Sequence, residues 1–239
     1  TLATNNTHTG GTTVNDGVLR LGNNTTTGSV PGTITINAPG TLEFFRSNGG
    51  NIGNFTGDGA LWIVGNGLSG QTSYDITTTT AGFTGTVTID DARLRMDPAD
   101  FDDTTTPITI LDGGQVYLIG GGSHNEDMLI SGIGWPEPAG NLGAIRFENN
   151  SVLNGNITLQ ANSRVTTWTG AIGLANGTIS GAFDLEKTGT GTLTLDPLEQ
   201  NTYGSTTVNQ GNLVAGNAGP YAFSTGPLTV NAGTLQLNG

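Results

Sequence analysis

Gly10–Gly22 reads GGTTVNDGVLRLG, and far along the chain Gly204–Gly216 reads GSTTVNQGNLVAG. Each stretch contains a strand-like segment in which Thr precedes Val, a turn with Asn and Gly, and a second short strand with Leu near its centre. Less exact copies of this unit begin at Gly32, Gly85, Ile108, Gly155, Gly189 and Gly226. Internal copies of this kind indicate a repeat architecture.

The unit that begins at Gly32 shows why such a repeat would fold. In Thr33–Ile36, Thr and Ile alternate, so one side of the strand is apolar and the other is polar. Asn37–Gly40 supplies residues that tolerate the left-handed conformation of a tight turn, and Thr41–Phe44 resumes the alternation. Strands this short bury little surface alone, whereas stacked coils bury one continuous column.

The spacing of the copies predicts the fold class. Similar units lie about 20 to 25 residues apart, which is the length of one coil of a β-solenoid. We therefore predict an all-β, right-handed parallel β-helix (β-solenoid) over 1–239, a single domain with a looped, less regular region about 97–142. A β-sandwich is the alternative, but it does not explain why distant segments copy one another. The predicted interior holds Ile34, Ile36, Leu42, Val208, Leu228, Val230 and Leu235.

The composition agrees with many short strands and argues against several classes of function. Among 239 residues there are 40 Gly, and only 34% are hydrophobic, so a large globular core is hard to build. The net charge of −12 argues against nucleic acid and against an anionic membrane surface as partners. The chain has no Cys, which leaves neither a disulfide nor a thiolate metal site.

The C-terminal part of the chain resembles a known family of repeats. The residues that carry the resemblance are Gly143–Phe147 (GAIRF), Gly155–Leu159 (GNITL), Ser180–Leu195 (SGAFDLEKTGTGTLTL) and Asn201–Val208 (NTYGSTTV). They are similar to the autotransporter-associated β-strand repeat, also called the passenger-associated transport repeat. Asn54–Leu61 is a degraded copy of the same block. The resemblance is close over 143–239 and 10–44 and looser over 45–142.

This resemblance implies a secreted passenger of the type V pathway, displayed as a β-helical stalk on the bacterial cell surface, on the extracellular side of the outer membrane. The chain would then be a fragment of a larger passenger. Its partners would be the outer-membrane barrel of its own chain, absent here, and a host-cell or extracellular-matrix receptor or a second copy of itself. Many members are adhesins, which links the family to virulence, and it has no catalytic or cofactor-binding residues to carry over. The absence of Cys agrees with threading through a narrow barrel.

Candidates for catalysis are few. His8 and His124, the two histidines, lie in no zinc-binding or nucleophile motif. Ser123 and His124 are neighbours in sequence, but neighbours on a strand point to opposite sides. We therefore expect no catalytic, cofactor-binding or metal-binding residues, and the sequence does not single out binding residues.

The acidic run at 90–103 is the most distinctive local feature, with Arg93 and Arg95 inside it. Its carboxylates would suit Ca²⁺, although the segment matches no calcium-binding loop. We expect Asp97 to Asp103 to form a loop off the solenoid without a tightly bound metal. The acidic residues are Asp90, Asp91, Asp97, Asp100, Asp102 and Asp103.

The segment Trp135–Pro138 (WPEP) interrupts the strand pattern, because its two prolines cannot donate ladder hydrogen bonds. Its Trp is either an exposed binding anchor or a side chain that folds back over the solenoid, and we favour the second. Trp62 and Trp168 lie on strand patterns and are expected to be packed.

These features together predict a structural and adhesive segment: a rigid surface stalk that aids outer-membrane translocation by folding progressively. One alternative is a carbohydrate-active β-helix enzyme, which would need aligned carboxylates on neighbouring coils. Another is a self-association module that links cells.

Overall fold

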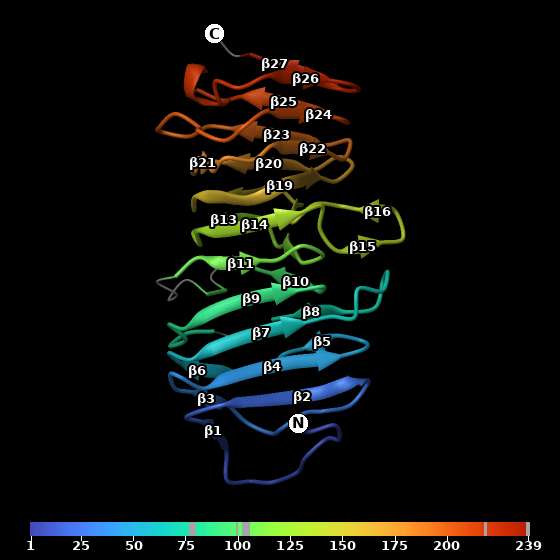
Figure 1. Cartoon of the computed structure of the whole chain (residues 1–239), viewed down its shortest axis with the longest axis vertical. Helices are drawn as coiled ribbons and strands as arrows, with labels where there is room; N and C mark the ends of the chain where they lie inside the picture. Colours follow the sequence, from blue (N-terminus) through green and yellow to red (C-terminus); the bar gives the residue numbers. More distant parts are fainter. Residues whose placement is uncertain (77–79, 99, 102–105, 218, 238–239) are drawn as a thin grey trace.

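The computed structural model is a stack of coils, each made of short strands joined by tight corners (Figure 1). It describes residues 1–76, 80–98, 100–101, 106–217 and 219–237. Apart from one hairpin, every strand pairing in these ranges is parallel. The predicted all-β parallel β-solenoid is confirmed, with about 10 turns.

In each coil the chain visits three faces in a fixed order. The first face begins with a sheet of three strands, continues through a bridge between Gly57 and Phe83, and resumes as a sheet of six strands. Its strands are β1 (Thr12–Val14), β3 (Ile34–Ile36), β6 (Phe55–Gly57), β13 (Gly122–His124), β18 (Ser151–Leu153), β20 (Ile172–Ala175), β23 (Thr192–Leu195), β25 (Asn212–Ala215) and β27 (Thr234–Gln236).

The second and third faces belong to one large sheet, because β19 (Ile157–Thr167) runs around the corner between them. The second face also holds β2 (Val18–Thr25), β4 (Thr41–Arg46), β7 (Ala60–Val64), β9 (Thr86–Asp90), β11 (Ile108–Ile110), β14 (Met128–Gly132) and β21 (Ile179–Ser180). The third face also holds β5 (Gly50–Asn51), β8 (Ser73–Asp75), β10 (Arg93–Met96), β12 (Gln115–Leu118), β17 (Ile145–Phe147), β22 (Leu185–Thr188), β24 (Thr206–Val208) and β26 (Leu228–Val230).

Two elements lie outside the three faces. The hairpin of β15 (Pro136–Glu137) and β16 (Gly140–Asn141) is antiparallel and projects from the stack (Figure 1). A short 3-10 helix, η1 (Gly219–Tyr221), precedes β26. The hairpin lengthens its coil: Leu118 pairs with Phe147, whereas Leu94 pairs with Val116 in a regular coil of 22 residues.

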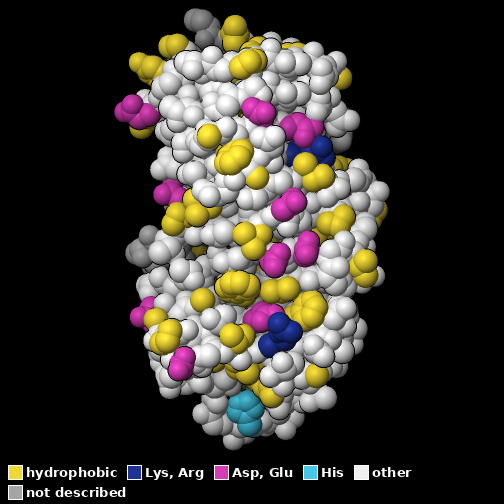
Figure 2. All heavy atoms as spheres, in the orientation of Figure 1, with side chains coloured by type: hydrophobic (Ala, Val, Ile, Leu, Met, Phe, Trp, Pro, Cys, Tyr) yellow, Lys and Arg dark blue, Asp and Glu magenta, His cyan; other side chains and the backbone are white. Residues whose placement is uncertain are grey.

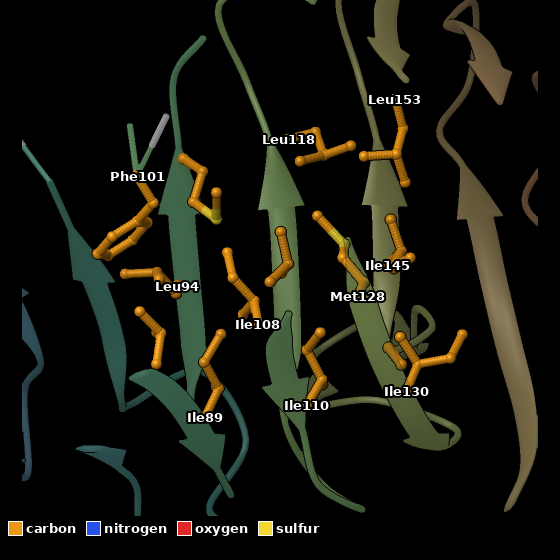
Figure 3. Packing of buried hydrophobic residues seen from close by; sticks show 14 of the residues in the cluster. Ile89, Leu94, Phe101, Ile108, Ile110, Leu118, Met128, Ile130, Ile145 and Leu153 are labelled. Atoms are coloured by element: carbon orange, nitrogen blue, oxygen red, sulfur yellow. The ribbon is translucent and has the colours of Figure 1, made fainter. Parts of the chain in front are cut away.

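The apolar core is built from rows that climb the stack one residue per coil. On the second face, Ile63, Ile89, Ile110 and Ile130 pair in succession, and each is fully buried. Figure 3 shows Ile89, Ile110 and Ile130 side by side on their strands. Because strand side chains alternate, the neighbouring row points outward; it holds polar residues such as Thr88 and Thr109, with Trp62 and Leu129 as exceptions. The alternation read from the sequence is thus the alternation of the fold.

The sequence repeat corresponds to a corner rather than to a whole coil. The unit Gly10–Gly22 carries β1 and β2 and turns from the first face to the second. Its copy Gly204–Gly216 carries β24 and β25 and turns from the third face to the first. The unit from Gly85 carries β9 and β10 and turns from the second face to the third. The same strand–turn–strand unit therefore serves at all three corners.

The stretch 97–142 combines regular strands with excursions. Strands β11 to β14 continue the ladders of the neighbouring coils. Phe101, within the acidic run, is fully buried, and its ring packs against those of Phe55 and Phe83. The prediction of a loop off the solenoid is therefore wrong at Phe101, because this large apolar side chain fills the core of the first face.

Candidate functional site

The third face carries an inward row that is apolar except at one position. Val165 pairs with Lys187, and Lys187 pairs with Val208. All three side chains are buried, with exposed fractions of 0 to 1%. A lysine side chain therefore occupies a place in the core where valine stands in the coils on either side.

Carbonyl groups at two corners surround the ammonium of Lys187. The three N–H groups of Nζ are shared among four carbonyl oxygens, those of Thr188 at 2.9 Å, Gly189 at 2.6 Å, Gly191 at 3.0 Å and Gln210 at 3.1 Å. The first three belong to the corner between β22 and β23, and Gln210 belongs to the next coil. Burial lowers the pKa of Lys187 to about 8. The side chain thus ties two successive corners together from inside, at the cost of burying a charge.

The C-terminal coil leaves the core open. The sequence predicted Leu228, Val230 and Leu235 inside, but Leu228 is 40% exposed, Val230 is 44% exposed and Leu235 is only partly buried. These side chains take inward register, since Val230 pairs with Val208. They are exposed because no strand of a further coil covers them among the described residues. Val208 itself is buried, as predicted, and so are Ile34, Ile36 and Leu42.

The other end of the stack is hollowed. A cavity of about 460 Å³ is lined by residues of the first coil, among them Leu2, Val14, Leu19 and Val30. Among the described residues, both ends thus present apolar side chains.

An arginine–aromatic cluster lies on the outside of the third face. Arg95, Tyr117 and Arg146 follow one another in one outward row. The guanidinium carbon of Arg146 lies 4.3 Å from the centre of the Tyr117 ring and 4.8 Å from that of Trp168. Arg93 completes the cluster, 5.4 Å from the Tyr117 ring centre. Burial raises the pKa of Tyr117 to about 12, and its hydrogen bond with Glu148 adds to this effect.

The hairpin folds back onto this cluster. Of the two alternatives given for Trp135, the preferred one, a side chain folded back over the solenoid, is therefore the one observed. The Trp135 side chain is 1% exposed, its Nε1 donates to Thr72 Oγ1 at 3.2 Å, and Arg93 lies 4.7 Å from the centre of its ring. Trp168 is partly buried beside Arg146. The prediction that Trp62 is packed is wrong: its side chain is 41% exposed, because it stands in the outward row of β7.

The two histidines lie in different surroundings, one exposed and one buried. His8 is exposed, and its Nε2 lies 3.0 Å from Thr12 Oγ1. His124 is fully buried in β13, whereas Ser123 beside it is exposed. The two side chains therefore point to opposite sides of the strand, as expected, and do not form a nucleophile–base pair.

The described part of the acidic run does not gather into one metal site. Arg93 reaches Glu137 on the hairpin, and Arg95 pairs with Asp75 at 2.8 Å. Asp100 is buried and accepts a hydrogen bond from the backbone N of Asp97 at 2.8 Å. Asp102 and Asp103 lie outside the described residues, and within the described ranges no three His, Asp or Glu side chains form a group that could hold a metal ion.

Acidic side chains are spread along the whole front of the molecule, and basic ones are confined to small areas (Figure 2). On this face the charge pattern offers no broad basic surface of the kind that binds nucleic acid. In the part of the chain that the structure describes, no helix has the length and apolarity needed to cross a membrane.

Three segments, residues 1–21, 185–215 and 224–237, match the family model described as passenger-associated-transport-repeat. These three segments are similar to passenger-associated transport repeats. No curated protein and no solved structure matches it. The transport repeats and the β-solenoid fold together match an autotransporter passenger. The family implies a secreted or cell-surface protein and suggests a structural segment without catalysis.

The transport repeats coincide with the regular ends of the stack. The match over 185–215 spans β22 to β25 and includes Lys187, and the match over 224–237 spans β26 and β27. Residues 22–184 lie outside the match, so it does not cover the resemblance noted from the sequence over 22–44 and 143–184. The arginine–aromatic cluster and the hairpin belong to this unmatched part.

Sequence reasoning did not single out Lys187 or the arginine–aromatic cluster. The signal for Lys187 is its place in the alternation, because Leu185 and Lys187 both take inward register in β22. No comparable signal exists for the cluster, whose members come from different coils and meet only when the coils stack.

Proposed function

We propose that the chain is a structural and adhesive segment of an autotransporter passenger, a rigid surface stalk that aids its own translocation by progressive folding. The observation that supports this best is the pairing pattern of the described strands, in which each coil pairs in parallel only with the coils before and after it. Such a quasi-one-dimensional stack can grow coil by coil.

The energetic basis lies in the inward rows. Each emerging coil finds an open edge and an apolar end surface of the kind that Leu228, Val230 and Leu235 present. Burying one such side chain contributes about 1.5 to 3 kcal/mol. Each added coil therefore opposes backward diffusion of the chain through a pore without any need for ATP.

The handedness, the partners and the absence of catalysis are also proposed. A right-handed coil is supported by the strong preference of parallel crossover connections for that hand. The proposed partners are the outer-membrane barrel of the same protein and a host-cell or extracellular-matrix receptor. The transport repeats support a type V secreted adhesin with its stalk on the extracellular side of the outer membrane.

The experiment is surface display. The chain is fused ahead of an outer-membrane barrel, and protease accessibility on intact cells measures how much reaches the outside. Val208→Asp places a charge in the inward row and should lower display severely. Thr207→Asp, the matched control, changes the outward neighbour on the same strand and should leave display unchanged. Equal display of both variants, with Val208→Asp unfolded, would refute assistance by folding.

A further inference from the structure

The arginine–aromatic cluster concentrates residue types that the chain otherwise avoids. The whole sequence has seven Lys and Arg and three Trp. Three of the seven, Arg93, Arg95 and Arg146, lie around the ring of Tyr117. Two of the three Trp, Trp135 and Trp168, stack on their guanidinium groups. In a protein with a net charge of −12, three of the seven basic side chains therefore lie in the arginine–aromatic cluster.

Two carboxylates contact this cluster: Glu148 of the solenoid pairs with Arg146 through Nη2, and Glu137 of the hairpin lies between Arg146 and Arg93. Glu137 Oε2 accepts a hydrogen bond from Arg146 Nη1 at 2.5 Å and one from Arg93 Nη1 at 3.2 Å. The other oxygen, Oε1, is buried and has no hydrogen-bond partner among the described residues, and neither has the buried Nε of Arg146. The Glu137 side chain is 8% exposed and that of Arg146 is 9% exposed. Both groups are desolvated with part of their hydrogen-bonding capacity unused.

This arrangement is a poor device for stability alone. A buried ion pair contributes little net stability, because desolvation offsets the attraction, and unpaired buried polar atoms add a further cost. An apolar contact between the hairpin and the third face would hold it at least as well. The two guanidiniums instead form a place that fits a carboxylate, which arginine recognises through its planar fork of donors.

The hairpin has the features of a movable cover. It is antiparallel in an otherwise parallel fold, and within the described ranges β15 and β16 pair only with one another. It leaves the stack through Gly132 and Gly134 and returns through Gly140 and Gly143, all of which have positive φ. Few hydrogen bonds tie it to the stack: Gly70 N donates to Pro136 O at 3.2 Å, Arg164 Nη1 donates to Asn141 O at 2.8 Å, and the buried Trp135 donates to Thr72. The glycines can absorb a change in backbone angles that would swing the cover aside.

We propose that Arg93 and Arg146 form a binding site for the carboxylate of an acidic sugar, which Glu137 occupies as an internal stand-in while the hairpin is closed. Tyr117 and Trp168 stay on the solenoid when the hairpin opens, and they keep the guanidinium of Arg146 in place. The face of the Arg93 guanidinium that Trp135 covers in the closed form then becomes free for the ring of the sugar. The proposal deepens the adhesive part of the proposed function by naming a ligand class, and it rests on that part. An acidic sugar binds the open form alone. Its apparent affinity therefore equals its affinity for that form multiplied by the fraction of open molecules.

The test is calorimetric titration of the full chain with glucuronate, glucose, acetate and glucose 6-sulfate. Glu137→Gln removes the internal charge while keeping the shape of the side chain. It should bind glucuronate about tenfold more tightly than the original protein, because the open form becomes more populated. Glu43→Gln is the matched control, because Glu43 pairs with Arg20 at 2.8 Å on the second face, away from the hairpin, and the affinity of this variant should equal that of the original protein. Glucose should not bind, and acetate should bind more weakly than glucuronate.

A second measurement keeps the proposal testable if Glu137→Gln fails to fold. In the original protein, saturating glucuronate should speed hydrogen exchange across 133–143, and glucose should not. Unchanged exchange, equal glucuronate affinity in Glu137→Gln and the original protein, or binding of glucose as tight as that of glucuronate would each overturn the proposal. Equal binding of glucose 6-sulfate would overturn the assignment to a carboxylate. None of these outcomes bears on coil-by-coil folding, which the display experiment tests separately.

Discussion

The Nζ of Lys187 donates a 2.6 Å hydrogen bond to the carbonyl oxygen of Gly189, inside a row that is otherwise apolar. Gly189 has a φ of 73° and begins the corner from the third face to the first. A corner turns its carbonyl groups away from the ladder, and those that face inward need a donor. Lys187 supplies that donor from the core, so one residue both fills the row and satisfies the turn.

Replacing Lys187 by Met should destabilise the protein by about 2 kcal/mol. Met keeps much of the apolar stem but leaves carbonyls at the buried corner without their donor, and an unsatisfied buried acceptor costs about 1 to 3 kcal/mol. Urea unfolding measures the difference. Arg164→Met is the control, because it removes a cation from the partly exposed pair with Glu186 and should cost less than about 1 kcal/mol. Equal costs for the two variants would contradict the role of Lys187.

The stability should rise with pH between about 8 and 10. Burial lowers the pKa of Lys187 from 10.5 to about 8, so in this window the unfolded chain holds a proton that the folded protein has released. The free energy of unfolding therefore increases with pH wherever the unfolded state binds more protons. Above about pH 10 the trend should reverse, because burial raises the pKa values of Tyr74 and Tyr117 to about 12 in the folded protein.

Urea unfolding at several pH values measures this dependence, with Lys187→Met as the reference. The variant lacks the titrating group, so the difference in stability between the original protein and the variant should grow across the window. A difference that shrinks between pH 8 and 10 would show that the folded protein holds the Lys187 proton more tightly than the unfolded chain does.

The same substitution at two neighbouring positions of one row should have unequal effects. Val208 and Val230 are paired, but Val208 is fully buried and Val230 is 44% exposed. Val208→Ala should cost about 2 kcal/mol, from lost burial and the cavity that remains. Val230→Ala should cost less than half as much. Thermal melts of both variants decide the point, and equal losses would mean that Val230 is covered in solution.

At the corner that contains Gly155, successive coils lie so close together that a side chain at this position should destabilise the protein. A Cβ on Gly155 would lie 1.9 Å from the carbonyl oxygen of Glu126 in the coil below, and a Cβ on Gly177 would lie 2.0 Å from the carbonyl oxygen of Gly155. Gly155→Ala should therefore cost about 1 to 3 kcal/mol through a forced backbone shift.

Gly10→Ala provides the matched control for this substitution. A Cβ on Gly10 would meet no atom of the described residues within 4 Å, so the change should stay within about 0.5 kcal/mol of the original stability. Both variants are compared by thermal melts. A Gly155→Ala protein as stable as Gly10→Ala would show that the coils are spaced more widely at this corner.

The buried core could be predicted from the sequence, whereas the arginine–aromatic cluster could not. The row Ile63, Ile89, Ile110 and Ile130 follows from alternation within each strand, which any short window of sequence displays. The arginine–aromatic cluster depends on which residues of different coils share a row. Tyr117 meets Arg146 only because an insertion containing the hairpin lengthens that coil without shifting its register. Local pattern carries no information about such an alignment.

The sequence by itself determined that the chain is built from short alternating strands joined by Gly and Asn turns, and its internal copies determined that these strands stack as parallel coils. Those properties are local, since they arise from the alternation of side chains and from the backbone freedom of turn residues. Only the tertiary structure decided at which of the three corners each copy lies, because the corners demand the same strand–turn–strand unit. It alone decided that Lys187 stands between valines and that Glu137 reaches two arginines, because both depend on the register between coils, which is set by packing across the whole stack.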